Sequence, residues 1–296
     1  MRRMATALAA LACAASAPAL AEPNVGSGSE AGDQEVVVTG ERLAGKKLHQ
    51  EAAEFVRRIG FATGHRPAAR WADAVCPAAY GLAPQHAAIV EAKLRQVAAE
   101  AGIEHQRPGC KPNLAVVFVE DGSAQAREMA RRLPSLFEEV GPVAKERLFK
   151  GDSPIRWWYS TQELGTDGRR PTSDSPYGSN GRTKTFSKFH SSIVSTEVIR
   201  AIHCAVVVVD VNRTAGRTLD TVSAYSALVA FAEISPREPP PDRSILDLFE
   251  TAPGPTRDLT EWDMTFLKAL YRMPLDREAR MHRGLLTQAL VRKKGG

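Results

Sequence analysis

The feature that most restricts the fold is an apolar run near the middle of the chain, Ile202–Val211, which contains four consecutive valines. A continuous β-branched run of this kind is typical of a strand that is buried on both faces of a sheet. A short Gly-containing turn follows, and then apolar residues at helical three- and four-residue spacings over 218–234. The sequence therefore predicts a strand–turn–helix unit at the core of an α/β fold.

Other segments extend this unit to a single domain. Leu114–Val119 is predicted to be a second buried strand, and a helix with Ser123 as its N-cap is expected to follow it. Thr260 and Asp263 have the spacing of a capping box, which predicts the start of a helix. We expect residues 47–296 to form one α/β (α+β) domain, with a mixed central sheet flanked by helices.

The first 21 residues have the three parts of a secretory signal peptide. Arg2 and Arg3 form its basic end, Ala5–Ala12 its short apolar core, and small residues up to Ala21 its cleavage site. This core is shorter than the roughly 20 residues of a membrane-spanning helix. A lipid anchor on Cys13 is disfavoured because the preceding residues do not follow the order of a lipobox. We expect cleavage near Ala21, a periplasmic or secreted protein, and no membrane span.

Export makes the remaining cysteines informative, because disulfides persist in oxidising compartments. Cys76 and Cys110 lie in predicted loops at opposite ends of one predicted helix, and they are the natural disulfide pair. Cys204 lies inside the predicted buried strand, where a protected core thiol is expected.

Residues 22–46 are rich in Gly, Ser and acidic residues, and we expect them to form a flexible leader. Within this leader, Glu35–Arg42 resembles the start of mature TonB-dependent outer-membrane receptors. The resemblance implies a contact with TonB by strand addition through Val36, Val37, Val38 and Thr39. The alternative is a chance β-rich segment in a linker.

Motifs for catalysis and for cofactor binding are absent from the sequence. It contains no H-E-x-x-H, C-x-x-C, G-x-S-x-G or phosphate-binding glycine motif, so no metal and no cofactor is expected. His190, His203 and Asp210 lie near the ends of predicted strands and could converge as a dispersed catalytic site. The alternative for Asp210, capping of the turn over 212–216, is favoured.

An aromatic strand offers a second candidate site. Arg156, Trp158 and Tyr159 lie beside a long basic loop and could stack against an anionic or sugar-like ligand. The alternative is an aromatic core strand. The formal net charge of +5 is spread along the chain, which does not favour a nucleic-acid surface.

Several short segments together resemble a family of exported proteins from alphaproteobacteria of the sphingomonad type. The residues that carry this resemblance are Val75–Leu82, Cys110–Asn113, Val206–Asp210, Gly216, Leu219, Tyr225, Leu259–Asp263, Leu270 and Tyr271. The resemblance covers most of the chain from about Leu48 to Pro274 and implies no known activity.

The order of buried strand, turn, helix and final Leu-Tyr helix is similar, more distantly, to a proteobacterial lipoprotein family with a zincin-like peptidase layout. In that family the helix matching residues 220–234 would carry the zinc-binding H-E-x-x-H. Here Thr221–Ala230 contains no histidine and no glutamate. The resemblance implies a peptidase-like scaffold without its metal, and no catalytic residue is carried over.

These observations favour a non-enzymatic, exported binding or scaffold protein. The alternatives are a hydrolase with a dispersed site over His190, His203 and Asp210, and an accessory protein linked to TonB.

Overall fold

The valine-rich run is the centre of a five-stranded sheet. In the computed structural model, which describes residues 40–170, 195–196, 198–236, 239–250 and 257–294, strand β5 covers Val198–Asp210. Strands β1 (Ala69–Trp71) and β3 (Leu114–Val119) both pair with β5 in parallel. Strand β2 (Pro77–Tyr80) pairs in parallel with β3, and β4 (Ile155–Gly165) pairs antiparallel with β5. The expected mixed central sheet is confirmed.

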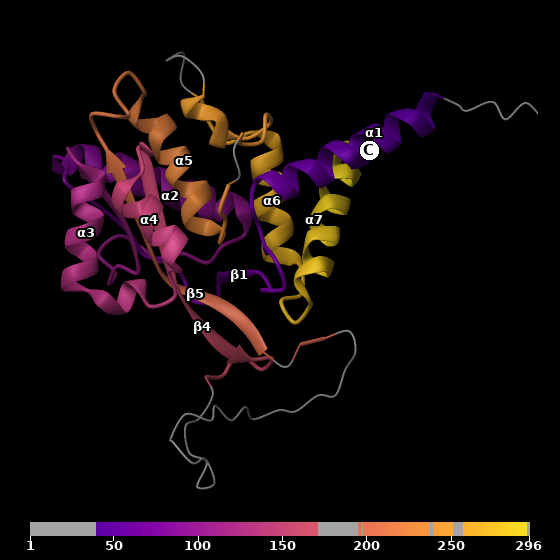
Figure 1. Cartoon of the computed structure of the whole chain (residues 1–296), viewed down its shortest axis with the longest axis horizontal. Helices are drawn as coiled ribbons and strands as arrows, with labels where there is room; N and C mark the ends of the chain where they lie inside the picture. The colour runs from indigo at the N-terminus through magenta and orange to yellow at the C-terminus, as the bar shows by residue number, and fades with distance from the viewer. Residues whose placement is uncertain (1–39, 171–194, 197, 237–238, 251–256, 295–296) are drawn as a thin grey trace, which may run out of the picture. The chain divides into compact units, whose positions relative to one another are not determined.

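The side chains of β5 alternate between two hydrophobic clusters, one on each face of the sheet. Figure 1 shows β5 side by side with β4, with helices packed around the sheet. Ala205, Val207 and Val209 belong to the larger core cluster, whereas Val206 and Val208 belong to the smaller one. Both faces of β5 are covered, so neither face requires polar side chains. This explains why its sequence is continuously apolar and does not alternate between apolar and polar residues.

Among the described elements, five α-helices and one 3-10 helix surround the larger cluster, and two α-helices and one 3-10 helix surround the smaller one. Around the larger cluster are α1 (Gly40–Arg58), α2 (Pro84–Ala101), α5 (Leu219–Phe231), α6 (Glu261–Arg272) and α7 (Ala279–Lys294). Around the smaller are α3 (Gly122–Arg132), the 3-10 helix η1 (Pro134–Phe137) and α4 (Pro142–Lys150). A second 3-10 helix, η2 (Ile245–Phe249), also contributes to the larger cluster.

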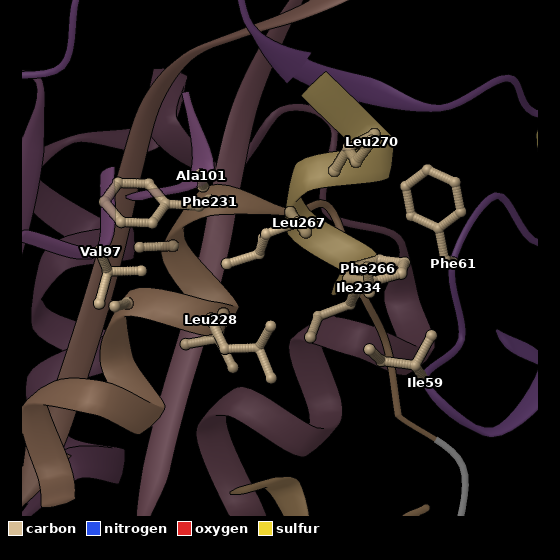
Figure 2. Close-up of a cluster of buried hydrophobic side chains, with 14 of the residues drawn as sticks. Ile59, Phe61, Val97, Ala101, Leu228, Phe231, Ile234, Phe266, Leu267 and Leu270 are labelled. Carbon is tan, nitrogen blue, oxygen red and sulfur yellow. The ribbon is translucent and has the colours of Figure 1, made fainter. Parts of the chain in front are cut away.

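Figure 2 shows how the larger cluster closes around α5 and α6. Leu267 of α6 and Leu228 of α5 extend into the same space, the Phe231 ring lies beside Val97 and Ala101 of α2, and Phe61 lies beside Phe266. The rings of Phe61 and Phe266 meet edge to face, with their centroids 5.4 Å apart. This packing fixes the end of α5, next to which the site described below is found.

Two helix starts differ from the sequence-based predictions. Helix α1 begins at Gly40, inside the segment expected to be a flexible leader up to residue 46. The prediction of Ser123 as an N-cap is wrong, because the Asp121 side chain accepts the hydrogen bond from the backbone N–H of Ala124. Asp121 lies two residues before Ser123, and its carboxylate is close to the backbone N–H groups of the first turn of α3, which have no partner within the helix. The capping box of Thr260 and Asp263 is confirmed.

The predicted disulfide between Cys76 and Cys110 is confirmed, with a Cα–Cα distance of 6.0 Å. It joins the segments that lead into the neighbouring parallel strands β2 and β3. Cys204 has a free thiol, is half-buried on β5, and has its pKa raised by burial. None of the described helices has both the length and the apolar character needed to cross a membrane.

Candidate functional site

The structure separates the residues of the predicted dispersed catalytic site. His190 lies outside the described residues. His203 and Asp210 lie on the same strand, seven residues apart, which corresponds to roughly 23 Å along extended backbone. The register shift opposite Ser160 and Thr161 leaves His203 without a partner on β4, so it is the extra residue of a β-bulge. His203 and Asp210 therefore do not face one site.

Asp210 fixes the turn after β5. Its carboxylate accepts hydrogen bonds from the backbone N–H groups of Gly122 and Arg213, each at 3.1 Å. Its backbone carbonyl accepts from the Thr214 hydroxyl at 2.9 Å. Buried at the carboxyl end of the central strand, Asp210 has the turn-capping contacts that were the alternative to a catalytic role.

The guanidinium of Arg156 is buried and already has protein partners. It donates to the backbone carbonyls of Leu148, Gly151 and Ser153, and to the Ser123 hydroxyl at 2.7 Å. These contacts hold the segment between α4 and β4 against the start of α3. Burial lowers the pKa of Arg156, with the charge of Asp210 opposing this effect. Arg156 therefore organises the fold here and has little capacity left to bind a ligand.

The aromatic residues of β4 divide between the two faces of the sheet. Trp158 packs against Phe137 with a centroid separation of 4.6 Å, and its Nε1 has no hydrogen-bond partner among the described residues. Tyr159 lies on the other face, where its hydroxyl contacts the backbone carbonyls of Val229 and Ala232. Burial raises the pKa of Tyr159 well above its usual value. The Tyr159 hydroxyl is thus a hydrogen-bond partner for the carbonyls at the C-terminal end of α5.

A cavity of about 510 Å³ lies along β4, which makes it a candidate site. This volume is within the usual range for a ligand pocket. One wall is formed by α4, and the opposite wall by Tyr225 and the segment from Ile234 to Glu250, of which residues 237–238 are not described. The residues of β4 that line it are Ile155, Arg156, Trp157, Trp158 and Tyr159.

Four charged residues form a cluster at this cavity, which we name the Arg66–Glu233 cluster: Arg66, Glu139, Arg200 and Glu233. The buried Arg200 guanidinium holds Glu233 with two contacts, at 2.5 and 2.9 Å. Arg66 contacts Glu139 at 2.9 Å and Glu233 at 3.7 Å. Two positive and two negative charges neutralise one another, so the cluster adds polarity without a strong preference for anions or cations.

The Arg66–Glu233 cluster also borders a second hollow of about 540 Å³, which includes Thr161, Gln162 and Arg170. The Thr161 hydroxyl donates to Glu139 and accepts from Arg200 at 3.1 Å, so it ties the two halves of the cluster together. The two hollows therefore share three charged lining residues, Arg66, Glu139 and Arg200.

The fold and this site define an α/β domain with a cavity along the margin of its sheet. No protein-family model, curated protein or solved structure matches the chain. Among the described residues, no group of three histidine, cysteine, aspartate or glutamate side chains could hold a metal ion. The helix that the zincin-like resemblance singles out, α5, is a buried core helix.

The sequence predicts strand β4, but it does not predict the Arg66–Glu233 cluster. Its members lie on four separate segments, and neither their spacing nor their type sets them apart from other surface charges. Arg200 alone gave a signal, because it is a charged residue directly before the valine-rich run that is predicted to be a buried strand. A charge in a buried strand is expected to have a partner.

Proposed function

We propose that this protein is an exported, non-enzymatic binding protein and that the cavity along β4 is its ligand site. The observation that carries the proposal is that one cavity combines aromatic and aliphatic side chains with the self-neutralised Arg66–Glu233 cluster. Pockets that bind small ligands or short chain segments combine an apolar lining with a few fixed polar groups in this way. The contacts to Asp210 and Arg156 support binding over catalysis, because both side chains hold the fold.

The proposed location is the periplasm or the cell exterior, after cleavage near Ala21. The Cys76–Cys110 disulfide supports this proposal, since such bonds are rare in reducing compartments. We further propose that the protein belongs to the exported sphingomonad-type family that its sequence resembles. The TonB contact through Val36–Thr39 lies outside the described residues, directly before α1, and stays a prediction from the sequence.

The binding proposal is tested by filling the cavity. Ala144 of α4 lines it, and Ala144→Trp would place an indole in the space beside β4. We expect the wild-type chain to bind the amphipathic dye anilinonaphthalene sulfonate at one equivalent, measured by fluorescence titration. The Ala144→Trp variant should bind it at least tenfold more weakly.

Val143→Trp is the matched control, because Val143 is the neighbouring residue of α4, is 65% exposed and does not line the cavity. It should leave dye binding within twofold of wild type. Equal loss in both variants, or no loss in either, would count against the cavity as the binding site. Circular dichroism and thermal unfolding of both variants confirm that the fold is kept.

A further inference from the structure

Strand β4 has one edge that no strand covers in the described part of the chain. β4 pairs with β5 from Ile155 to Gly165, and no other described strand pairs with it. β5 in turn gives its opposite edge to β1 and β3. Among the described strands β4 is therefore the last one on its side of the sheet, and an uncovered edge presents N–H and C=O groups that can pair with another chain.

The alternation of hydrogen bonds shows which groups point outward. The N–H of Asp210 donates to the carbonyl of Pro154, and the N–H groups of Ala205 and Val211 donate to the segment of β3. Between the bulge at His203 and Asp210, the even-numbered residues of β5 thus bond β4, and the backbone groups of their partners Arg156 and Trp158 face inward. The backbone N–H and C=O groups of Ile155, Trp157 and Tyr159 consequently point away from β5.

The cavity runs along this same stretch of edge. It is lined by Ser153 to Tyr159, with α4 on one side and the Ile234–Glu250 wall on the other. The distance from Ile155 to Tyr159 corresponds to roughly 14 Å of strand, the length of four to five paired residues. A strand beside a helix, with its outward hydrogen-bonding groups at the floor of a groove, is the arrangement of strand-addition peptide sites.

The two walls offer different surroundings to alternate side chains of an added strand. One wall presents the rings of Tyr225 and Phe249 with Leu246, and the other presents Ala144 and Leu148 of α4. Each wall also carries a charged side chain, Arg147 on α4 and Glu250 on the other wall, so both combine apolar and polar groups. The Arg66–Glu233 cluster is electrically balanced, so the groove suits the neutral but polar backbone of a peptide better than a highly charged ligand.

We propose that the ligand is an extended peptide segment of another protein, which pairs with the outer edge of β4 through the backbone groups of Ile155, Trp157 and Tyr159. The proposal rests on the proposed function, because it specifies the class of ligand for the same cavity. The segment would carry apolar side chains toward the two walls and would need four to five residues in strand conformation.

The test uses the full mature chain and a library of acetylated, amidated hexapeptides with Val, Leu or Tyr at alternate positions and Ser or Thr between them. Displacement of anilinonaphthalene sulfonate selects the tightest peptide. Amide hydrogen exchange, followed by NMR, then compares the free and bound chain. We expect exchange at Ile155, Trp157 and Tyr159 to slow at least tenfold on binding, whereas Arg156 and Trp158 are slow in both states.

N-methylation of the selected peptide gives a second readout. Methylating the alternate residues whose N–H groups face β4 should weaken binding at least tenfold, and methylating the other set should change it less than threefold. Equal sensitivity of both sets overturns strand pairing.

The remaining outcomes separate this proposal from the proposed function. If the dye binds but no peptide displaces it, or if a peptide displaces it without protecting the three amides, strand pairing is overturned and the cavity site stands. Protection of these amides before any peptide is added also overturns the proposal, because another part of the chain or a second copy would then cover the edge. If the dye does not bind, both proposals fail.

Discussion

Asp263 joins the start of α6 to η2 through one buried carboxylate. It accepts hydrogen bonds from the backbone N–H groups of Ile245, at 2.8 Å, and Thr260, at 2.9 Å. The Ser244 hydroxyl is a third donor, at 2.5 Å. Because Asp263 is fully buried, no water can replace these contacts when the carboxylate is changed.

Asp263→Asn is therefore expected to destabilise the domain. The amide keeps one acceptor oxygen but turns its NH₂ group toward a buried backbone donor, at a cost of about 2 kcal/mol in the free energy of unfolding. The control is Glu261→Gln in the same helical turn, whose side chain is 57% exposed and which should change stability by less than about 0.5 kcal/mol. Urea unfolding at pH 7 measures both, and equal costs would contradict the assignment.

The same carboxylate predicts a pH dependence. Burial raises the pKa of Asp263 to about 6, although hydrogen bonds from Ser244, Ile245 and Thr260 act in the opposite direction. The folded state then binds more protons than the unfolded state between pH 3.8 and about 6, so this group's contribution to stability falls as the pH rises through that window.

We expect the cost of Asp263→Asn to be larger at pH 4 than at pH 7, by about 1–2 kcal/mol, since the asparagine does not titrate. Urea unfolding of wild type and variant at both pH values measures the difference. A cost that instead grows with pH would show that the hydrogen bonds outweigh burial and hold the pKa of Asp263 below its usual range.

At the scale of elements, aromatic side chains complete the C-terminal end of α5. The last carbonyls of a helix have no partner within it, and α5 ends in the core, where water is excluded. The indole of Trp71 donates to Ala230, the hydroxyl of Tyr271 to Phe231, and the indole of Trp157 to Ile234. The Tyr159 hydroxyl contacts the backbone carbonyls of Val229 and Ala232. Aromatic hydrogen-bond donors from β1, β4 and α6 therefore hold the C-terminal end of α5.

Tyr159→Phe tests this account, because it removes the hydroxyl and keeps the ring. We expect a loss of about 1–3 kcal/mol in the free energy of unfolding, since buried carbonyls lose a donor. Tyr80→Phe is the matched control, as Tyr80 is 47% exposed and should change stability by less than about 0.5 kcal/mol. A cost below that value for Tyr159→Phe would show that water or another group satisfies these carbonyls.

Patterns within one segment predicted the elements well. The β-branched runs of β3 and β5 and the capping box of α6 depend on residues close in sequence. The aromatic positions of β4 have long-range partners, so their roles could not be assigned from the sequence. Their alternation indicated a strand, but the carbonyls they contact belong to a helix some 70 residues later.

At the scale of the whole molecule, the candidate site depends on tertiary contacts that no local pattern specifies. Arg66 lies 73 residues before its partner Glu139, and Arg200 lies 33 residues before Glu233. Apart from Arg200, which precedes the valine-rich run, each of these residues has the sequence context of an ordinary surface charge. The cavity between α4 and the Ile234–Glu250 wall likewise arises only when β4 becomes the margin of the sheet.

The disulfide is the one long-range contact that the sequence did predict, because only three cysteines follow the predicted cleavage site and one of them lies in a predicted buried strand. It closes a unit of two parallel strands and the helix between them, with Cys76 and Cys110 separated by 34 residues. Hydrogen bonds reinforce the same junction, since Asn113 Oδ1 accepts from the N–H of Cys76 at 2.7 Å. The bond therefore holds β2 against β3 where the two strands begin.

Replacing both cysteines, as Cys76→Ala and Cys110→Ala, should lower the free energy of unfolding by about 3–4 kcal/mol, because the unfolded chain regains the freedom of a 34-residue loop. Urea unfolding with and without dithiothreitol measures this loss. The reductant should bring the wild-type chain to the stability of the double variant and leave the variant itself unchanged. If the reduced wild type kept its full stability, the bond would contribute little to the fold. The disulfide would then be no argument for an oxidising location, because a domain that is equally stable without the bond does not depend on an oxidising compartment.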